Sequence, residues 1–200
     1  MKILVTGAAG QLGTDVIKEL KKRKVEFIGI DLSADTDIDA VDITDEKAIH
    51  AYIKEKKPQS VVHCAAYTAV DKAEDEPEIC YKINAEGTEN IARACAELEA
   101  EMIYISTDYV FDGKGETPYK TDAVKGPVSI YGKSKLAGEE AVKKHLENYY
   151  IVRISWVFGK TGNNFVKTMI KLAETRDELN VVGDQIGSPT YTPDLAVLLE

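Results

Sequence analysis

The stretch VTGAAGQLG, residues 5 to 13, ends a short apolar run and begins a segment of helical period, with glycines at positions 7, 10 and 13. A tight turn, close approach of the backbone to a pyrophosphate and close packing of a helix each require a residue without a side chain. The N-terminus of the following helix offers amides to an anion. The next apolar run ends in Asp31, where an acidic residue can accept hydrogen bonds from a dinucleotide's ribose. The stretch predicts a strand, a turn and a helix that bind a dinucleotide through Gly7, Gly10, Gly13 and Asp31.

Short β-rich runs alternate with longer segments of helical period along the chain. The expected strands are residues 2–6, 25–31, 60–64, 102–106, 149–155 and 179–182. The expected helices are residues 11–24, 45–57, 78–99, 131–147 and 163–174. Regular alternation of strand and helix predicts an α/β fold, a doubly wound parallel sheet of Rossmann type, with ligands at the carboxyl ends of the strands.

The chain is expected to contain two domains. Residues 1–160 would form the dinucleotide-binding domain, and residues 161–200 the start of a smaller substrate-binding region interleaved with the last strands. The final stretch, TPDLAVLLE, begins a helix without a C-terminal cap, so we expect this smaller domain to be incomplete here. Residues 107–129 form a long segment rich in Gly, Pro and Asp, and loops of that length tend to cover sites.

The composition, 44% apolar and 30% charged over 200 residues, is that of a globular protein. A net charge of −9 provides no basic surface, so nucleic acid is not expected as a partner. Three widely spaced cysteines fit neither a disulfide framework nor a zinc site, and no metal site is expected. The apolar opening is too short for a signal sequence and no run reaches membrane-spanning length, which predicts a cytoplasmic protein without a membrane partner.

The stretch YGKSK, residues 131 to 135, places Tyr131 and Lys135 on one face of a helix. Spacing alone favours two exposed side chains on a solvated helix. The glycine spacing and this pair together, however, resemble the extended branch of the short-chain dehydrogenase/reductase superfamily. In that superfamily the Tyr-x-x-x-Lys pair performs acid/base chemistry, and the preceding strand ends in a catalytic hydroxyl, here at Ser106 or Thr107.

Longer strings narrow the resemblance. They include AAYTAVDKAEDEP at 65–77, YKINAEGTENIARA at 81–94, STDYVFDGKGETPY at 106–119, YGKSKLAGE at 131–139, RISWVFG at 153–159, NNFVKTM at 163–169 and GDQIGSPTYTPDLA at 183–196. Together they closely resemble the dTDP-4-dehydrorhamnose reductase family over essentially the whole chain. The resemblance implies an oxidoreductase that transfers a hydride from NADH or NADPH to C4 of dTDP-4-dehydro-L-rhamnose, giving dTDP-L-rhamnose. No arginine follows Asp31 within DLSADTD, so we expect NADH to be accepted, and a preference over NADPH is left open.

The resemblance also implies roles for individual residues. Tyr131 would donate the proton, Lys135 would lower its pKa and bind the nicotinamide ribose, and Thr107 would tune Tyr131 and touch the sugar oxygen. Beside the glycines and Asp31, the cofactor would contact Gln11, Leu12, Asp42, Ile43, Ala65, Ala66 and Tyr67. The substrate would contact Thr107, Asp108, Trp156, Asn163 and Asn164. From the residues alone, Trp156 fits a core tryptophan equally well, and helix N-capping explains at least one of the two asparagines.

Other functions stay open at this point. A dehydratase of the same branch would carry Thr-Asp-Glu where this chain has Thr107, Asp108 and Tyr109, and the missing carboxylate argues against elimination. An epimerase is less favoured, because STDYVF does not resemble its usual text. A non-catalytic relative, the regulatory β subunit of methionine adenosyltransferase, shares much of the motif set. A homodimer is compatible with the sequence but not required by it.

Overall fold

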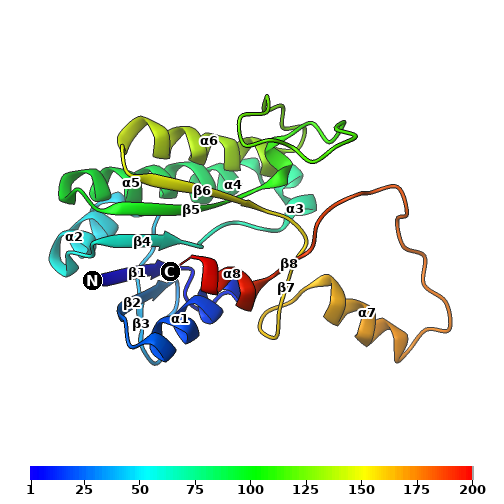
Figure 1. The fold of residues 1–200 in the computed structure, drawn as a ribbon, viewed down its shortest axis with the longest axis horizontal. Coiled ribbons are helices and arrows are strands. Elements are labelled where there is room, and N and C mark those ends of the chain that lie inside the picture. Colours follow the sequence, from blue (N-terminus) through cyan, green and yellow to red (C-terminus); the bar gives the residue numbers. More distant parts are fainter. Residues whose placement is uncertain (200) are drawn as a thin grey trace.

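The computed structural model describes residues 1–199, which contain a six-stranded parallel sheet in the order β3-β2-β1-β4-β5-β6 (Figure 1). The strands are β1 (Lys2–Thr6), β2 (Glu26–Asp31), β3 (Ile38–Ala40), β4 (Ser60–His63), β5 (Glu101–Thr107) and β6 (Tyr149–Ile154). The sheet grows outward in both directions from β1 and β4. A crevice is expected between the carboxyl ends of these two strands, because the connections leave them on opposite sides. The doubly wound fold predicted from the sequence is confirmed.

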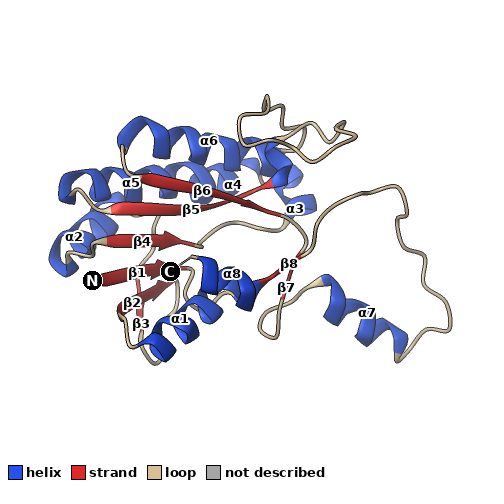
Figure 2. Cartoon of the chain, viewed as in Figure 1, coloured by secondary structure: helices blue, strands red, loops and turns tan. Residues whose placement is uncertain are grey.

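Helices cover both faces of this sheet (Figure 2). One face carries α1 (Gln11–Arg23) and α8 (Thr192–Leu198), and the other carries α2 (Glu46–Lys56), α5 (Gly87–Leu98) and α6 (Ile130–His145). The alternation of side chains along a strand explains the two cores. In β1, Leu4 packs with Ile49 and Ile91, whereas Ile3 and Val5 belong to the cluster around α1.

The helix predicted over residues 78–99 consists of three consecutive pieces. These are α4 (Pro77–Tyr81), the π-helical turn η1 (Lys82–Glu86) and α5, and the short helix α3 (Val70–Asp75) precedes them. A π-helical turn widens the helix by one residue and is often found at functional sites. Here it contains Asn84, a fully buried amide whose contacts reach the site.

One predicted strand is wrong. Residues 179–182 form no strand, and Val181 and Val182 are exposed at 53% and 69%. A short apolar run becomes a strand only where a neighbouring strand supplies hydrogen bonds, and none lies beside this one among residues 1–199. The chain instead forms a two-residue parallel pair of β7 (Val157–Phe158) with β8 (Thr190–Tyr191), which the sequence reading missed along with β3.

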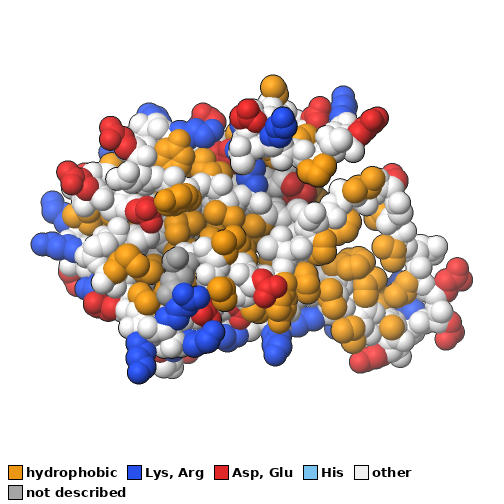
Figure 3. Space-filling model, in the orientation of Figure 1, with side chains coloured by type: hydrophobic (Ala, Val, Ile, Leu, Met, Phe, Trp, Pro, Cys, Tyr) orange, Lys and Arg blue, Asp and Glu red, His pale blue; other side chains and the backbone are white. Residues whose placement is uncertain are grey.

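Between β7 and β8 the chain leaves the body of the sheet as an arm that contains α7 (Phe165–Ala173) (Figure 1). No residue of α7 is buried, and hydrophobic side chains gather on this part of the surface (Figure 3). The arm returns through α8, where the buried Thr192 hydroxyl donates to Asp15 Oδ2 of α1 at 2.6 Å. No helix among residues 1–199 has the length and apolar character needed to cross a membrane.

Candidate active site

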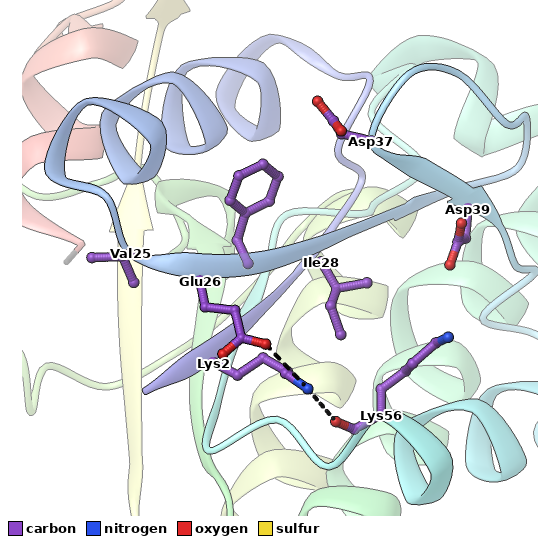
Figure 4. A pocket seen from close by; sticks show the side chains of 8 residues that line it. Lys2, Val25, Glu26, Ile28, Asp37, Asp39 and Lys56 are labelled. Atoms are coloured by element: carbon purple, nitrogen blue, oxygen red, sulfur yellow. Dashed lines mark hydrogen bonds and ion pairs between the residues drawn. The ribbon is translucent and has the colours of Figure 1, made fainter.

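A cavity of about 930 Å³ opens at the carboxyl ends of β1, β2, β4 and β5. Its walls include the glycine turn, the ends of these strands, the start of α6 and the segment around Trp156. A second cavity, about 480 Å³, lies by the amino ends of β1 and β2, where Lys2 pairs with Glu26 at 3.3 Å (Figure 4). Ligands of doubly wound sheets bind at the carboxyl ends, so the larger cavity is the candidate site.

The glycine turn forms the cavity floor after β1. Gly7 has φ +64, and a Cβ there would lie 2.7 Å from the Ala65 nitrogen. A Cβ at Gly13 would overlap the Gly7 carbonyl oxygen, so the start of α1 can pack on the turn only without a side chain. Gly7, Gly10, Gln11 and Leu12 line the cavity, whereas Gly13 is buried at the start of α1. The exposed turn backbone at the start of α1 fits a pyrophosphate.

Asp31 lies at the end of β2 on the cavity wall. Its carboxylate accepts hydrogen bonds from the amides of Ala9, at 3.0 Å, and Leu32, at 2.8 Å. The residue therefore braces the glycine turn as well as facing the cavity. Asp42 and Ile43 line the same end of the cavity, which brings the predicted ribose and adenine contacts together.

Tyr131 and Lys135 are not the exposed pair that spacing alone favours. Tyr131 is 9% exposed and Lys135 is 2% exposed, and both line the cavity. The Ser129 side chain caps α6 by accepting from the Gly132 amide at 3.0 Å. Glu74 of α3 accepts a hydrogen bond from the Ile130 amide at 2.7 Å, and this bond anchors the start of α6. These contacts fix the helix turn that carries Tyr131.

The two ionisable groups respond to burial in opposite directions. Burial raises the pKa of Tyr131 to about 12, with Asp108 adding to the rise and a hydrogen bond with Thr107 opposing it. Burial lowers the pKa of Lys135 to about 7, against the influence of Cys64, Glu139 and Cys80. Lys135 was expected to lower the pKa of Tyr131. In this structure the pKa of Tyr131 is raised instead, because desolvation is the dominant effect at both residues.

The Lys135 ammonium and the Thr107 hydroxyl are both anchored at the end of β5. Lys135 Nζ donates to the Ile105 carbonyl at 2.7 Å and lies 4.2 Å from the centre of the Tyr104 ring. Thr107, 4% exposed, donates to Asp108 Oδ1 at 3.1 Å and accepts from the Tyr109 amide at 3.2 Å. The predicted catalytic hydroxyl, phenol and ammonium thus share one wall of the cavity.

The predicted substrate residues divide into two groups. Trp156 is 49% exposed and lines the cavity, which excludes the core tryptophan considered above. Asp108 and Asn163 line it too. Asn164 instead caps α7 by accepting from the Lys167 amide at 3.1 Å, and its amide donates to Gln11 Oε1 at 3.0 Å. It is absent from the lining within residues 1–199, as is the whole of the long loop from Phe111 to Ser129.

On the nicotinamide side, Ala65 and Ala66 line the cavity, but the Tyr67 ring does not. The Tyr67 hydroxyl donates a hydrogen bond to Glu76 Oε2 at 2.8 Å. The Asn84 side chain accepts from the Tyr67 amide at 2.8 Å and donates to the Tyr67 carbonyl at 3.1 Å. The lining residues that were not predicted from the sequence include Thr68, Val70, Ile79, Lys82, Ile83, Ser155 and Val157. Five of these seven belong to residues 68–83, a segment that also contains the short helices α3 and α4.

Within the described residues, no three His, Cys, Asp or Glu side chains gather in a group that could hold a metal ion. The cavity's donors include the turn amides, the hydroxyls of Ser106, Thr107 and Tyr131, and the Lys135 ammonium. Such a set suits an organic ligand with phosphate and hydroxyl groups.

The doubly wound sheet, the glycine turn after β1 and the buried Tyr131/Lys135 pair define a protein of the extended short-chain dehydrogenase/reductase class. The chain belongs to the family described as the RmlD substrate binding domain, whose model matches residues 1–200. Comparison with individual proteins agrees with this assignment.

The chain is 45% identical over 195 residues to the spore coat polysaccharide biosynthesis protein SpsK of Bacillus subtilis, covering 98% of this chain and 67% of that protein. It is 44% identical over 196 residues to a dTDP-4-dehydrorhamnose reductase of Mycolicibacterium smegmatis, covering 97% of this chain and 58% of that protein. The chain thus spans between 58% and 67% of the length of these two relatives.

Solved structures give the same result. The crystal structure of a dTDP-4-dehydrorhamnose reductase from Clostridium acetobutylicum superposes with a TM-score of 0.93 at 50% identity, covering 100% of this chain and 69% of that one. The reductase from Bacillus anthracis, solved in complex with NADP, superposes with a TM-score of 0.93 at 45% identity, covering 99% and 68%.

Proposed function

We propose that this protein reduces the C4 keto group of dTDP-4-dehydro-L-rhamnose with NADH or NADPH and forms dTDP-L-rhamnose. The observation that carries the proposal is the burial of Tyr131 and Lys135 in the wall of the cavity, beside Thr107. A solvated helix pair would not bury an ammonium, because desolvating a charge is costly. The family to which the chain belongs supports the choice of substrate.

The residues present fit a nicotinamide dinucleotide. A side chain at Gly7 or Gly13 would obstruct the turn, the start of α1 follows directly, and Asp31 closes β2 on the same wall. The pyrophosphate would contact the turn at Gly10, Gln11 and Leu12, the adenosine would contact Asp31, Asp42 and Ile43, and the nicotinamide would lie along Ala65 and Ala66. When bound, the reduced dinucleotide supplies the hydride.

The chain's own groups then handle the proton. Because burial raises the pKa of Tyr131 to about 12, the phenol holds its proton at neutral pH, as a proton donor to the C4 oxygen must. Thr107 would hold the same oxygen, and the Lys135 ammonium would bind the nicotinamide ribose and stabilise the phenolate that forms. Trp156 and Asn163 face the cavity where the sugar nucleotide would lie.

We infer that residues 1–160 form the dinucleotide domain, that the protein acts in the cytoplasm, where reduced dinucleotides and nucleotide sugars occur, and that it can form a homodimer. Sedimentation of the full-length protein tests the last of these.

Tyr131→Phe tests the proposed function directly, because it removes one phenol oxygen and little area. In the full-length protein, we expect NADH oxidation to require dTDP-4-dehydro-L-rhamnose and to fall by a factor on the order of 10² to 10⁴ in the variant. NADH binding, titrated by fluorescence, should stay nearly unchanged. Equal loss of binding and turnover would contradict the assigned role, and NADH binding without sugar-dependent oxidation in the unaltered protein would favour a regulatory binding protein.

A further inference from the structure

Three successive residues of β5 are bonded to α6 immediately before Thr107. The Tyr104 hydroxyl donates to the Lys135 carbonyl at 3.3 Å, Lys135 Nζ donates to the Ile105 carbonyl at 2.7 Å, and the Ser106 hydroxyl donates to Glu139 Oε1 at 2.7 Å. Glu139 follows Lys135 by one helical turn, so both side chains leave α6 on the face that meets the strand. These bonds fix the position of α6 along β5.

Glu139 is fully buried, and its charge is matched by Arg153 of β6. Arg153 Nε donates to Oε1 at 2.8 Å and Nη2 donates to Oε2 at 2.8 Å, while Nη1 donates to the Thr121 carbonyl at 3.0 Å. Burial alone would raise the pKa of Glu139, but the bonds from Arg153 and Ser106 lower it, so the carboxylate stays ionised. Burial of an ionised carboxylate costs free energy that its partners offset, and an apolar pair of similar volume is often at least as stable.

Five ionisable side chains lie near the Lys135 ammonium or act on its charge. They are His63, Cys64, Cys80, Tyr104 and Glu139. Burial lowers the pKa of His63 to about 3 and raises that of Cys64 to about 12, so both are neutral at pH 7. Glu139 is the only carboxylate in this group within residues 1–199, and it acts to keep the lysine protonated.

We propose that Glu139 is a positioning residue that acts through Lys135. Anchored by Arg153 and Ser106, its carboxylate holds α6 against β5, so that Lys135, one helical turn earlier, and Tyr131 face the cavity beside Thr107. This inference rests on the proposed function, in which a charged Lys135 binds the dinucleotide, and it adds a residue that does not touch cofactor or substrate.

The test measures the protonation of Lys135 in the free full-length protein, by NMR titration of ¹³C-labelled lysine side chains. The Lys135 resonance is assigned as the one lost in Lys135→Arg. Two variants are compared, Glu139→Gln and the double variant Glu139→Gln/Arg153→Met, since the single variant leaves the arginine charge unpaired and can unfold. The matched control is Glu140→Gln, which removes the neighbouring exposed carboxylate that pairs with Lys143 at 2.8 Å.

We expect the Lys135 midpoint to fall by about one pH unit in the folded double variant, the lower end of the effect of a nearby opposite charge. If binding requires the charged lysine, NADH binding should then weaken about ninefold at pH 8 but only about twofold at pH 6. Glu140→Gln should change neither quantity. An unchanged Lys135 midpoint in a double variant that keeps its native circular dichroism would overturn the proposal. The titration needs no sugar nucleotide, so failure of the reductase assay would count against the proposed function and leave this result standing.

Discussion

Lys135→Met should change how the stability of the protein depends on pH. The pKa of Lys135 falls from 10.5 to about 7 on folding, because the ammonium is buried. Below pH 7 the lysine is charged in both the folded and the unfolded chain, and the folded state bears the full cost, about 5 kcal/mol. Above pH 7 the folded protein releases this proton while the unfolded chain keeps it until about pH 10.5. The unfolded state therefore binds more protons at this site, and the contribution of Lys135 to the free energy of unfolding rises with pH between about 7 and 10.5.

Between pH 7 and pH 9 the gain from this one group is about 2 kcal/mol, from the two pKa values and the linkage relation. Urea unfolding of the full-length protein at several pH values gives the free energy of unfolding directly. The difference curve between the unaltered protein and Lys135→Met isolates the lysine, because all other groups titrate in both. Lys133→Met, on the exposed side of the same helix, is the matched control and should leave the slope unchanged. If the free energy of unfolding has the same pH dependence in the unaltered protein and in Lys135→Met, Lys135 is not a buried group with a pKa near 7.

Three other substitutions test the cofactor end and the arm. Asp31→Ala should weaken NADH by about tenfold more than NADPH in a binding titration, because the ribose hydroxyl loses its acceptor; an equal or larger loss for NADPH would remove Asp31 from the ribose. Gly7→Ala should lower the free energy of unfolding by about 2 kcal/mol or more and abolish NADH binding, since φ is +64 and the added Cβ meets Ala65. Thr192→Val should cost about 1 to 3 kcal/mol in urea unfolding, because the buried Asp15 carboxylate loses its 2.6 Å donor; no change would mean that this bond does not hold α8 to α1.

The main sheet could be predicted because each of its longer strands carries its own local signal. β1 alternates Ile3 and Val5 toward one core with Leu4 toward the other, and the turn after it requires glycine. The predictions of strands are wrong where a strand forms only because a distant segment supplies its hydrogen bonds. Residues 179–182 are apolar but unpaired, whereas Val157 pairs with Thr190, across the whole arm, in a run too short to recognise.

The predicted site residues show the same difference between local signals and long-range contacts. Asp31 and Thr107 end β2 and β5, and parallel strands bring their carboxyl ends to one edge, so their place in one cavity could be predicted. The exposure of Trp156 and the outward turn of the Tyr67 ring could not, since they depend on a left-handed backbone at φ +48 and on the buried Asn84. Nothing local to Glu139 indicates that Arg153, on the next strand, neutralises it.

The buried charges also distinguish function from stability. A helix that only needed to pack on β5 would gain more from a leucine or methionine than from a lysine with a depressed pKa, and replacing a buried ion pair by apolar residues is often neutral or stabilising. The chain nevertheless buries Lys135 and, one turn away, Glu139 with its arginine. The lysine lines the cavity and the glutamate does not, so a role for Glu139 at the site has to be indirect. The Glu139 and Arg153 pair costs free energy to bury, and what it provides in return is a fixed position of α6, and so of Lys135, against β5 and β6.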